Sequence, residues 1–279
     1  MFTRDVFPEL TGWDITRDTL HAYSKVLSAV RRNLVKPHPK HWHLSLTVTE
    51  NGFSAPDIPF PTTAAEKFAL SMNLKSHKLV LSTTTGGYRE IGLAKGLSTA
   101  AFAAQVLNTL VGFNIQISPD PELLEDDTER GYIPEHAEAY QAALSSTNRI
   151  FKMWKKQLGE DTSPVQLWPN QFDLSLEWFG TKKVFYEENG KNLESQAQIG
   201  FGFSPGDSQI LEPYFYANPW PFEREVTHSS LPKEARWYTE SWEGSLMPYK
   251  VLVNHPTARE LLLDYFKAVH EAGKASMTL

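Results

Sequence analysis

The sequence predicts an α+β fold of two similar halves, each a mostly antiparallel sheet packed with long helices. Three observations carry this prediction. Helical periodicity of apolar residues occurs near both ends and in the middle of the chain, strand-like runs are joined by tight turns such as Gly86-Gly87, and no regular β-α-β-α alternation occurs. With 279 residues, the chain is long enough for one large domain or for two fused halves.

The first half is predicted to run from a helix through several strands to a second helix. Residues 16–34 place Leu20, Tyr23 and Leu27 on one apolar stripe, and the prolines that follow end this helix. Residues 41–50 alternate as a strand, whereas the prolines of 53–61 favour an edge or irregular segment. The remaining predicted elements are strands at 67–74, 77–85 and 88–94 and a helix at 98–111.

A Pro-bounded acidic linker at 119–134 is predicted to separate a half at 1–118 from a half at 135–279. The second half opens with a long amphipathic helix at 135–158, and a final helix is predicted at 256–273. Between these helices, strands are predicted at 164–169, 172–180, 197–203 and 212–218, with a short segment near 245–253. The two halves are expected to pack into one compact unit.

Both halves have a similar order of elements, which favours an internal duplication. The strand after the opening helix reads WHLSLTV at 42–48 in the first half and FDLSLEW at 172–178 in the second. Repeated units favour a symmetric packing. In this alignment His43 and Asp173 occupy equivalent positions.

Composition excludes several classes of function. The formal net charge is -6 and neither half is basic, which argues against a nucleic-acid groove or an anionic-membrane surface. The absence of cysteine excludes disulfides, thiolate nucleophiles and Cys-ligated zinc. No stretch has the apolar length of a membrane span or of a signal peptide. We therefore expect a cytoplasmic protein, with no cofactor because no phosphate-binding motif occurs.

The most tempting chemistry lies in His41-Trp42-His43. On a strand these two histidines would share a face and could both bind one metal ion. A catalytic zinc site needs a third protein ligand, and no local motif supplies one. A metal-dependent hydrolase or lyase is thus disfavoured, and the alternative is an exposed strand edge.

A small-molecule site is the leading hypothesis. His43 and Asp173 are the candidate catalytic pair, because a carboxylate that fixes an imidazole tautomer makes a usable general base. The candidate ligand-binding residues are His21, Trp42, Gln166 and Trp168, in an aromatic-lined pocket between the halves. The alternative is that His43 and Asp173 are a structural pair or two unrelated surface residues.

A second hypothesis is a protein-protein interaction module. The segment Tyr214–Phe222 is rich in aromatic residues and proline, and an exposed loop of this kind could dock a protein partner. Substitution of Trp220 by alanine would separate this hypothesis from the small-molecule site. Neither hypothesis identifies a reaction.

Several short motifs together resemble a bacterial family, domain-of-unknown-function family 5996. The motifs are Trp13, Thr19-Leu20-His21, Trp42-His43, Val48-Thr49, Gly52, Ser163-Pro164-Val165, Trp168, Phe172-Asp173-Leu174, Pro205-Gly206, EPYFYANPWP and Pro248-Tyr249. The resemblance runs nearly end to end and implies no activity. In two places the chain departs from the family pattern, because Gln166 stands where a histidine often follows Ser-Pro-Val, and His41 lies outside the pattern.

Overall fold

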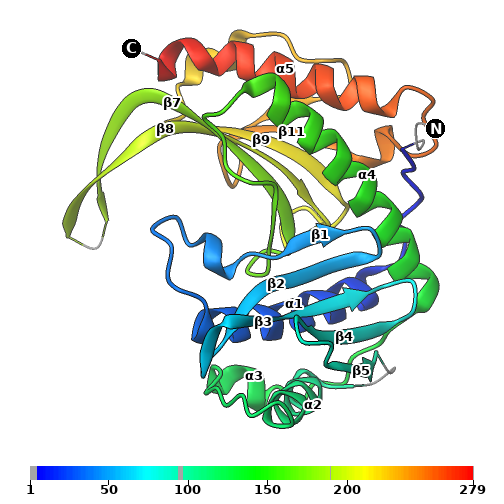
Figure 1. Cartoon of the computed structure of the whole chain (residues 1–279). Coiled ribbons are helices and arrows are strands. Elements are labelled where there is room, and N and C mark those ends of the chain that lie inside the picture. Colours follow the sequence, from blue (N-terminus) through cyan, green and yellow to red (C-terminus); the bar gives the residue numbers. More distant parts are fainter. Residues whose placement is uncertain (1–4, 94–96, 189, 279) are drawn as a thin grey trace. The chain divides into compact units, whose positions relative to one another are not determined.

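The chain consists of helices and two antiparallel sheets, which confirms the predicted α+β class (Figure 1). The computed structural model describes residues 5–93, 97–188 and 190–278. Contacts divide the chain into two compact units. Unit 1 comprises the described parts of Met1–Glu9, Ser146–Val165 and Asp173–Leu279, and unit 2 comprises those of Leu10–Ser145 and Gln166–Phe172.

Unit 2 is built on an antiparallel meander. Its strands are β1 (Thr47–Thr49), β2 (Gly52–Phe60), β3 (Thr63–Asn73), β4 (Lys78–Thr83) and β5 (Tyr88–Gly92), paired in that order. Its helices are α1 (Asp14–Leu34), α2 (Thr99–Val111), α3 (Pro121–Glu125) and the first part of α4 (Pro134–Leu158), and it also holds β6 (Gln166–Trp168). The predicted helices over 16–34 and 98–111 are confirmed, and Ser98 caps α2 by accepting the N–H of Ala101 at 3.1 Å.

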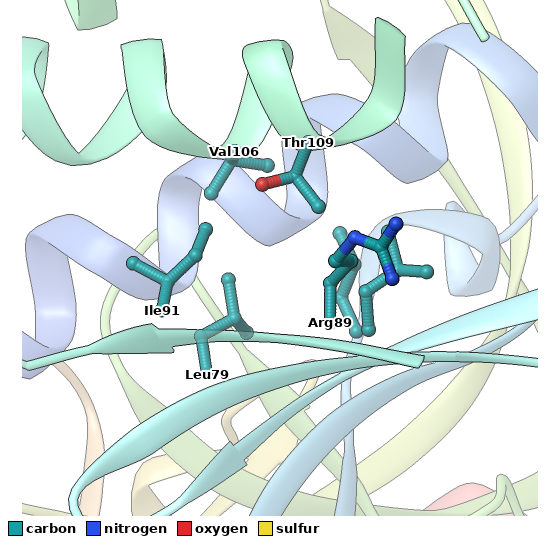
Figure 2. A pocket seen from close by; sticks show the side chains of 7 residues that line it. Leu79, Arg89, Ile91, Val106 and Thr109 are labelled. Atoms are coloured by element: carbon teal, nitrogen blue, oxygen red, sulfur yellow. The ribbon is translucent and has the colours of Figure 1, made fainter. Parts of the chain in front are cut away.

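Helix α2 packs closely on this sheet. Figure 2 shows Val106 of α2 above Leu79 of β4 and Ile91 of β5, with Arg89 and Thr109 beside them. The space among these side chains leaves no room for a water molecule. It is therefore part of the core and offers no ligand site.

Unit 1 contains a second antiparallel sheet and two long helices. Its strands are β7 (Asp173–Glu188), β8 (Lys191–Ser204), β9 (Tyr214–Trp220), β10 (Arg236–Tyr238) and β11 (Gly244–Pro248), which pair in the order β10-β11-β9-β8-β7. Its helices are the last part of α4 and α5 (Ala258–Met277), with short 3-10 turns at Arg224–His228 and Tyr249–Val251. The predicted helices over 135–158 and 256–273 are confirmed, the latter with a shift of its ends.

One face of the unit 1 sheet forms the core with these helices. Phe201 of β8 lies 5.1 Å, ring centre to ring centre, from Phe266 of α5, and 5.5 Å from Trp154 of α4. Leu174, Leu176, Ile199, Phe203 and Phe215 on this face are all at most 1% exposed. Alternation along the strands therefore directs the intervening residues to the opposite face.

The start of unit 1 ties its two helices together. The carboxylate of Asp5, only 5% exposed, accepts hydrogen bonds from Arg149 of α4 at 2.9 Å and Arg259 of α5 at 2.6 Å. Two guanidinium groups on one buried carboxylate compensate its desolvation.

The prediction of a strand over 41–50 is wrong for its first half. Trp42–Leu44 form a 3-10 turn, η1, and only Thr47–Thr49 form β1. Side chains of α1 explain this difference, because Arg31 donates to the carbonyl of His43 at 2.8 Å and Ser28 donates to that of Leu44 at 2.8 Å. These carbonyls are thus bonded to a helix rather than to a neighbouring strand.

Residues 53–61 are predicted to be an edge or irregular segment, and Gly52–Phe60 form the strand β2, which beyond Ser54 is paired on one side only. It pairs with β3 through a register shift between Ala55 and Ile58, while β1 pairs only with Gly52, Phe53 and Ser54. Its prolines lie outside the part of β2 that has strands on both sides. In that position their missing N–H groups cost no hydrogen bond to a second neighbouring strand. The internal duplication stays a prediction.

Candidate functional site

The face of the unit 1 sheet opposite the helices carries polar and aromatic side chains, and we call it the Asp173 face. Residues directly opposite in a sheet share a face, so the register defines its members. Around Asp173 they are Asp173, Ser175 and Glu177 of β7, Gly200, Gly202 and Ser204 of β8, Tyr214, Tyr216 and Asn218 of β9, Arg236 and Tyr238 of β10, and Gly244, Leu246 and Pro248 of β11. Near its start, β7 thus presents two carboxyl groups on this face, those of Asp173 and Glu177, while Arg236 lies on β10.

A carboxyl and a phenol meet across β8. The hydroxyl of Tyr216 on β9 donates a short hydrogen bond to Oδ2 of Asp173 on β7. Between these strands lies Gly202, directly opposite both Ser175 and Tyr216, and a Cβ at Gly202 would overlap the Tyr216 ring. The missing side chain is therefore what allows the tyrosine to lie across β8 and reach Asp173.

Burial changes the acidity of both partners. It raises the pKa of Asp173 to about 6, and the negative charge of Glu177 adds to this rise, while the hydrogen bond from Tyr216 opposes it. Burial and the neighbouring Asp173 charge raise the pKa of Tyr216 well above its ordinary value. Near pH 6 the phenol is thus protonated and Asp173 is close to its titration midpoint, as suits a group that exchanges protons or holds a cation.

Four aromatic side chains pack together on this face, namely Tyr214, Tyr216, Tyr238 and Trp242, which we call the aromatic cluster. Tyr216 joins this cluster to Asp173. The Trp242 ring lies 4.7 Å from that of Tyr238 and 6.3 Å from those of Tyr214 and Tyr216. Asp207 holds the cluster at one side, because its carboxylate accepts from the Tyr214 hydroxyl at 2.7 Å. On the rim, the guanidinium carbon of Arg236 lies 5.0 Å from the centre of the Tyr238 ring.

In unit 2, His21 and Gln166 anchor the backbone. The Nε2 of His21 lies 2.9 Å from the carbonyl of Pro169, and its ring stacks on Phe172 at 5.5 Å. Burial lowers the pKa of His21, so the neutral ring donates from Nε2. The Gln166 amide donates to Ser45 at 2.5 Å. Both side chains therefore hold the segment 166–172 within unit 2.

His43 is held in one tautomer. Its Nδ1 lies 3.0 Å from the backbone N–H of His38, which can only donate, so the neutral ring carries its proton on Nε2. Partial burial and the positive charges of His41 and Arg31 lower its pKa. The Nε2 therefore has no lone pair for a metal while this bond persists.

The histidine pair differs from the predicted strand arrangement. His41 has a left-handed backbone (φ 56°) and its ring lies 6.2 Å from that of His43, at the start of a 3-10 turn. Trp42 stacks on His38 at 4.4 Å. In the described part of the chain, no group of three or more His, Asp or Glu side chains is arranged to hold a metal ion.

The predicted site residues fall in both units. His21, Trp42, His43, Gln166 and Trp168 belong to unit 2, whereas Asp173 belongs to unit 1. Gln166 is linked to Trp42 through Ser45, whose hydroxyl donates to the Trp42 carbonyl at 2.8 Å. Trp168 is half-buried in its short strand. The His43–Asp173 pair and the pocket between the halves stay predictions.

Sequence reasoning missed Tyr216, Gly202 and Trp242. A signal for the first two exists, because GFGF at 200–203 alternates glycine with a core phenylalanine, which predicts a strand face without side chains.

The description of Tyr214–Phe222 as an exposed loop is wrong for most of its length. Residues Tyr214–Trp220 form β9, paired with β8 and β11, and Phe215 and Ala217 are fully buried.

Comparison with known proteins identifies one relationship. The model of a family of unknown function, DUF5996, matches residues 7–278, in agreement with the resemblance in the short motifs. No curated protein and no solved structure is significantly similar to the chain. Among the described residues, no helix combines the length and apolar character needed to cross a membrane.

Proposed function

Because the chain belongs to DUF5996, a family of unknown function, we propose a function from the Asp173 face alone: this face binds a small organic molecule that carries a basic nitrogen. Asp173 is the anionic anchor and the aromatic cluster is the wall against which the cation packs. The observation that carries the proposal is the half-buried Asp173 carboxyl, which accepts a hydrogen bond from Tyr216, a member of the aromatic cluster.

Charge and ring chemistry both favour a cation. Asp173 and Glu177 lie on the same strand face, and their mutual repulsion is relieved when a positive group lies between or beside them. Aromatic faces attract ammonium and guanidinium groups by about 0.5–2 kcal/mol each. Arg236 already stacks on Tyr238 in this way. A ligand amine would extend the same arrangement toward the carboxyl.

The raised pKa of Asp173 adds a dependence on pH. A bound cation stabilises the carboxylate over the carboxylic acid, so ligand binding lowers the pKa of Asp173. By linkage, affinity for the cation should rise as the pH increases through about 6, where the free protein loses the Asp173 proton, and then level off.

A calorimetric titration tests this proposal. The probes are benzylamine, phenethylamine, cyclohexylamine and putrescine, with benzyl alcohol and benzoate as neutral and anionic controls. We expect saturable binding of at least one amine and none of the controls. Asp173→Asn should weaken that binding by roughly 30-fold, which corresponds to a lost ionic contact of about 2 kcal/mol.

Asp264→Asn is the matched control, because Asp264 is an exposed carboxylate of α5 in the same unit. It should bind the amine as the unchanged protein does. If none of the four amines binds at millimolar concentration, or if benzoate binds as well as benzylamine does, the proposal is wrong. The same titration with His43→Ala tests the sequence-based proposal that His43 contributes to a site.

General acid-base catalysis on the bound molecule is a second candidate function. The specific observation in its favour is the pKa of Asp173 near 6, which lets the carboxyl both accept and release a proton near neutral pH. Any amine that binds can be incubated with the protein and followed by proton NMR. Proton exchange or chemical conversion of the ligand that depends on Asp173 would support catalysis. An unchanged ligand would support binding without catalysis.

A further inference from the structure

The strands β7 and β8 extend well beyond the rest of the unit 1 sheet. The third strand, β9, pairs only with Gln198–Ser204 of β8, whereas the β7–β8 pairing continues out to Glu188 and Lys191. Residues 183–188 and 191–196 therefore form a two-stranded ribbon, which we call the arm and which Figure 1 shows curving away from the other strands of unit 1. Isolated two-stranded ribbons are only marginally stable in water.

In the part of the chain that the structure describes, the outer edge of the arm has no strand beside it. Nearer the sheet, the backbone of Asp161 and Ser163 bonds to Phe179 and Glu177 of β7 at 2.9 and 2.8 Å. Within the described residues, no strand pairs with the outer side of Lys183–Glu187. Phe185 on this edge is 74% exposed, and such an edge is a ready template for a further strand.

The sequence of this edge is complementary to itself. If two copies run antiparallel about a twofold axis at Phe185, Lys183 of each lies opposite Glu187 of the other, and Val184 lies opposite Tyr186. The two Phe185 side chains then lie directly opposite each other on the same face as the two Lys–Glu pairs. Every cross-strand pair between 183 and 187 is thus either oppositely charged or apolar.

We propose that two copies of this chain associate through the outer edges of β7, in antiparallel register centred on Phe185. The interface is isologous, so β7 of each copy provides the lysine of one charge pair and the glutamate of the other. Within the described chain Glu187 forms no ion pair, and Lys183 contacts Glu194 of β8 at 2.6 Å, so that lysine would lie between two carboxylates in the dimer. The proposal is independent of the Asp173 face.

Sedimentation equilibrium of charge-reversed variants tests the register. Lys183→Glu places like charges opposite Glu187, and Glu187→Lys places like charges opposite Lys183, so each variant should raise the dimer dissociation constant roughly tenfold. An equimolar mixture of the two variants restores opposite charges in a heterodimer, and the double variant restores them in a homodimer. Both should dimerise as the unchanged protein does.

A disulfide test is possible because the chain contains no cysteine. Residues directly opposite in an antiparallel pair have Cα atoms about 4.5–5.5 Å apart, which suits a disulfide. Phe185→Cys should therefore form a covalent dimer under mild oxidation. The matched control is Asn192→Cys, exposed on β8, since three strand spacings place the two copies of Asn192 at least about 14 Å apart.

Several results would overturn the proposal. An unchanged protein that is monomeric at all concentrations reached excludes this dimer, and a dimer that survives both single charge reversals uses another surface. Equal crosslinking of Phe185→Cys and Asn192→Cys shows random collision rather than a fixed register. Circular dichroism of each variant confirms that it is folded, so that a loss of association is not a loss of fold.

Discussion

Two regions that adjoin in the sequence use their polar side chains in opposite ways. The segment 166–172 of unit 2 is bonded by His21 and Gln166, and the next residue, Asp173, begins the polar face of unit 1. His21 bonds to backbone carbonyls, which are obligatory acceptors of the fold. Asp173 instead accepts a hydrogen bond from a phenol on another strand, which is a contact between two side chains.

The two titratable groups also respond to pH with opposite signs. Burial lowers the pKa of His21, so the unfolded chain binds more protons there, and its contribution to stability falls as the pH drops below about 6.5. Burial raises the pKa of Asp173, so the folded chain binds more protons, and stability falls as the pH rises through about 4 to 6. Near neutral pH Asp173 thus lowers the stability of the fold, whereas His21 does not.

The largest expected effect comes from the glycine beneath Tyr216. Gly202→Ala introduces a Cβ that overlaps the Tyr216 ring, so the ring must move away from Asp173. We expect a loss of about 2–3 kcal/mol in unfolding free energy by urea titration, and a loss of amine binding. The control is Gly92→Ala, where nothing lies within 4 Å of the added Cβ and the change should stay within about 0.5 kcal/mol. Similar results for both variants would contradict this role of Gly202.

The next effect separates the two regions. His21→Ala removes a stacked ring and a buried donor to Pro169, and should cost about 2 kcal/mol of stability. Amine binding should not change, because His21 only positions unit 2 backbone. The exposed His228 supplies a control, His228→Ala, which should alter neither stability nor binding. A loss of amine affinity in folded His21→Ala would show that the two regions act together.

Much of the fold could be predicted from periodicity. The apolar stripe of Leu20, Tyr23 and Leu27 is fully buried along α1, and the alternation of Phe201 and Phe203 marks the core face of β8. These patterns depend only on near neighbours in sequence. The strand predicted over 41–50 failed because Arg31 and Ser28 bond to the carbonyls of 43 and 44, and such contacts leave no local pattern.

The site was harder to predict for a similar reason. Asp173 stood out as a polar residue in a strand, but its partner Tyr216 lies 43 positions away and on the next strand but one. Their contact depends on two registers and on the missing side chain of Gly202, and registers are properties of the assembled sheet. Local sequence can indicate that Gly200 and Gly202 leave a bare strand face, but not which ring lies over it.

A smaller effect distinguishes a functional carboxyl from a structural one. Asp173→Asn keeps an acceptor for Tyr216 and removes the charge, so it should stabilise the protein on the order of 1–2 kcal/mol at about pH 7.5. At about pH 4, where Asp173 is protonated in the folded protein, the difference should disappear. Urea titrations of both proteins at the two pH values measure this. A variant less stable at both values would show that the carboxylate itself stabilises the fold.

The smallest expected change in stability comes from the phenol. Tyr216→Phe keeps the ring over Gly202 but removes the donor to Asp173, at a cost of about 0.5–1.5 kcal/mol. The hydrogen bond from Tyr216 opposes the rise in the pKa of Asp173, so its loss should raise that pKa further. The curve of amine affinity against pH should then keep its shape, but its midpoint should move above about 6, because deprotonation of Asp173 now requires a higher pH. If the midpoint stays in place while the affinity falls at every pH, Tyr216 contacts the ligand directly and Asp173 is tuned by burial alone.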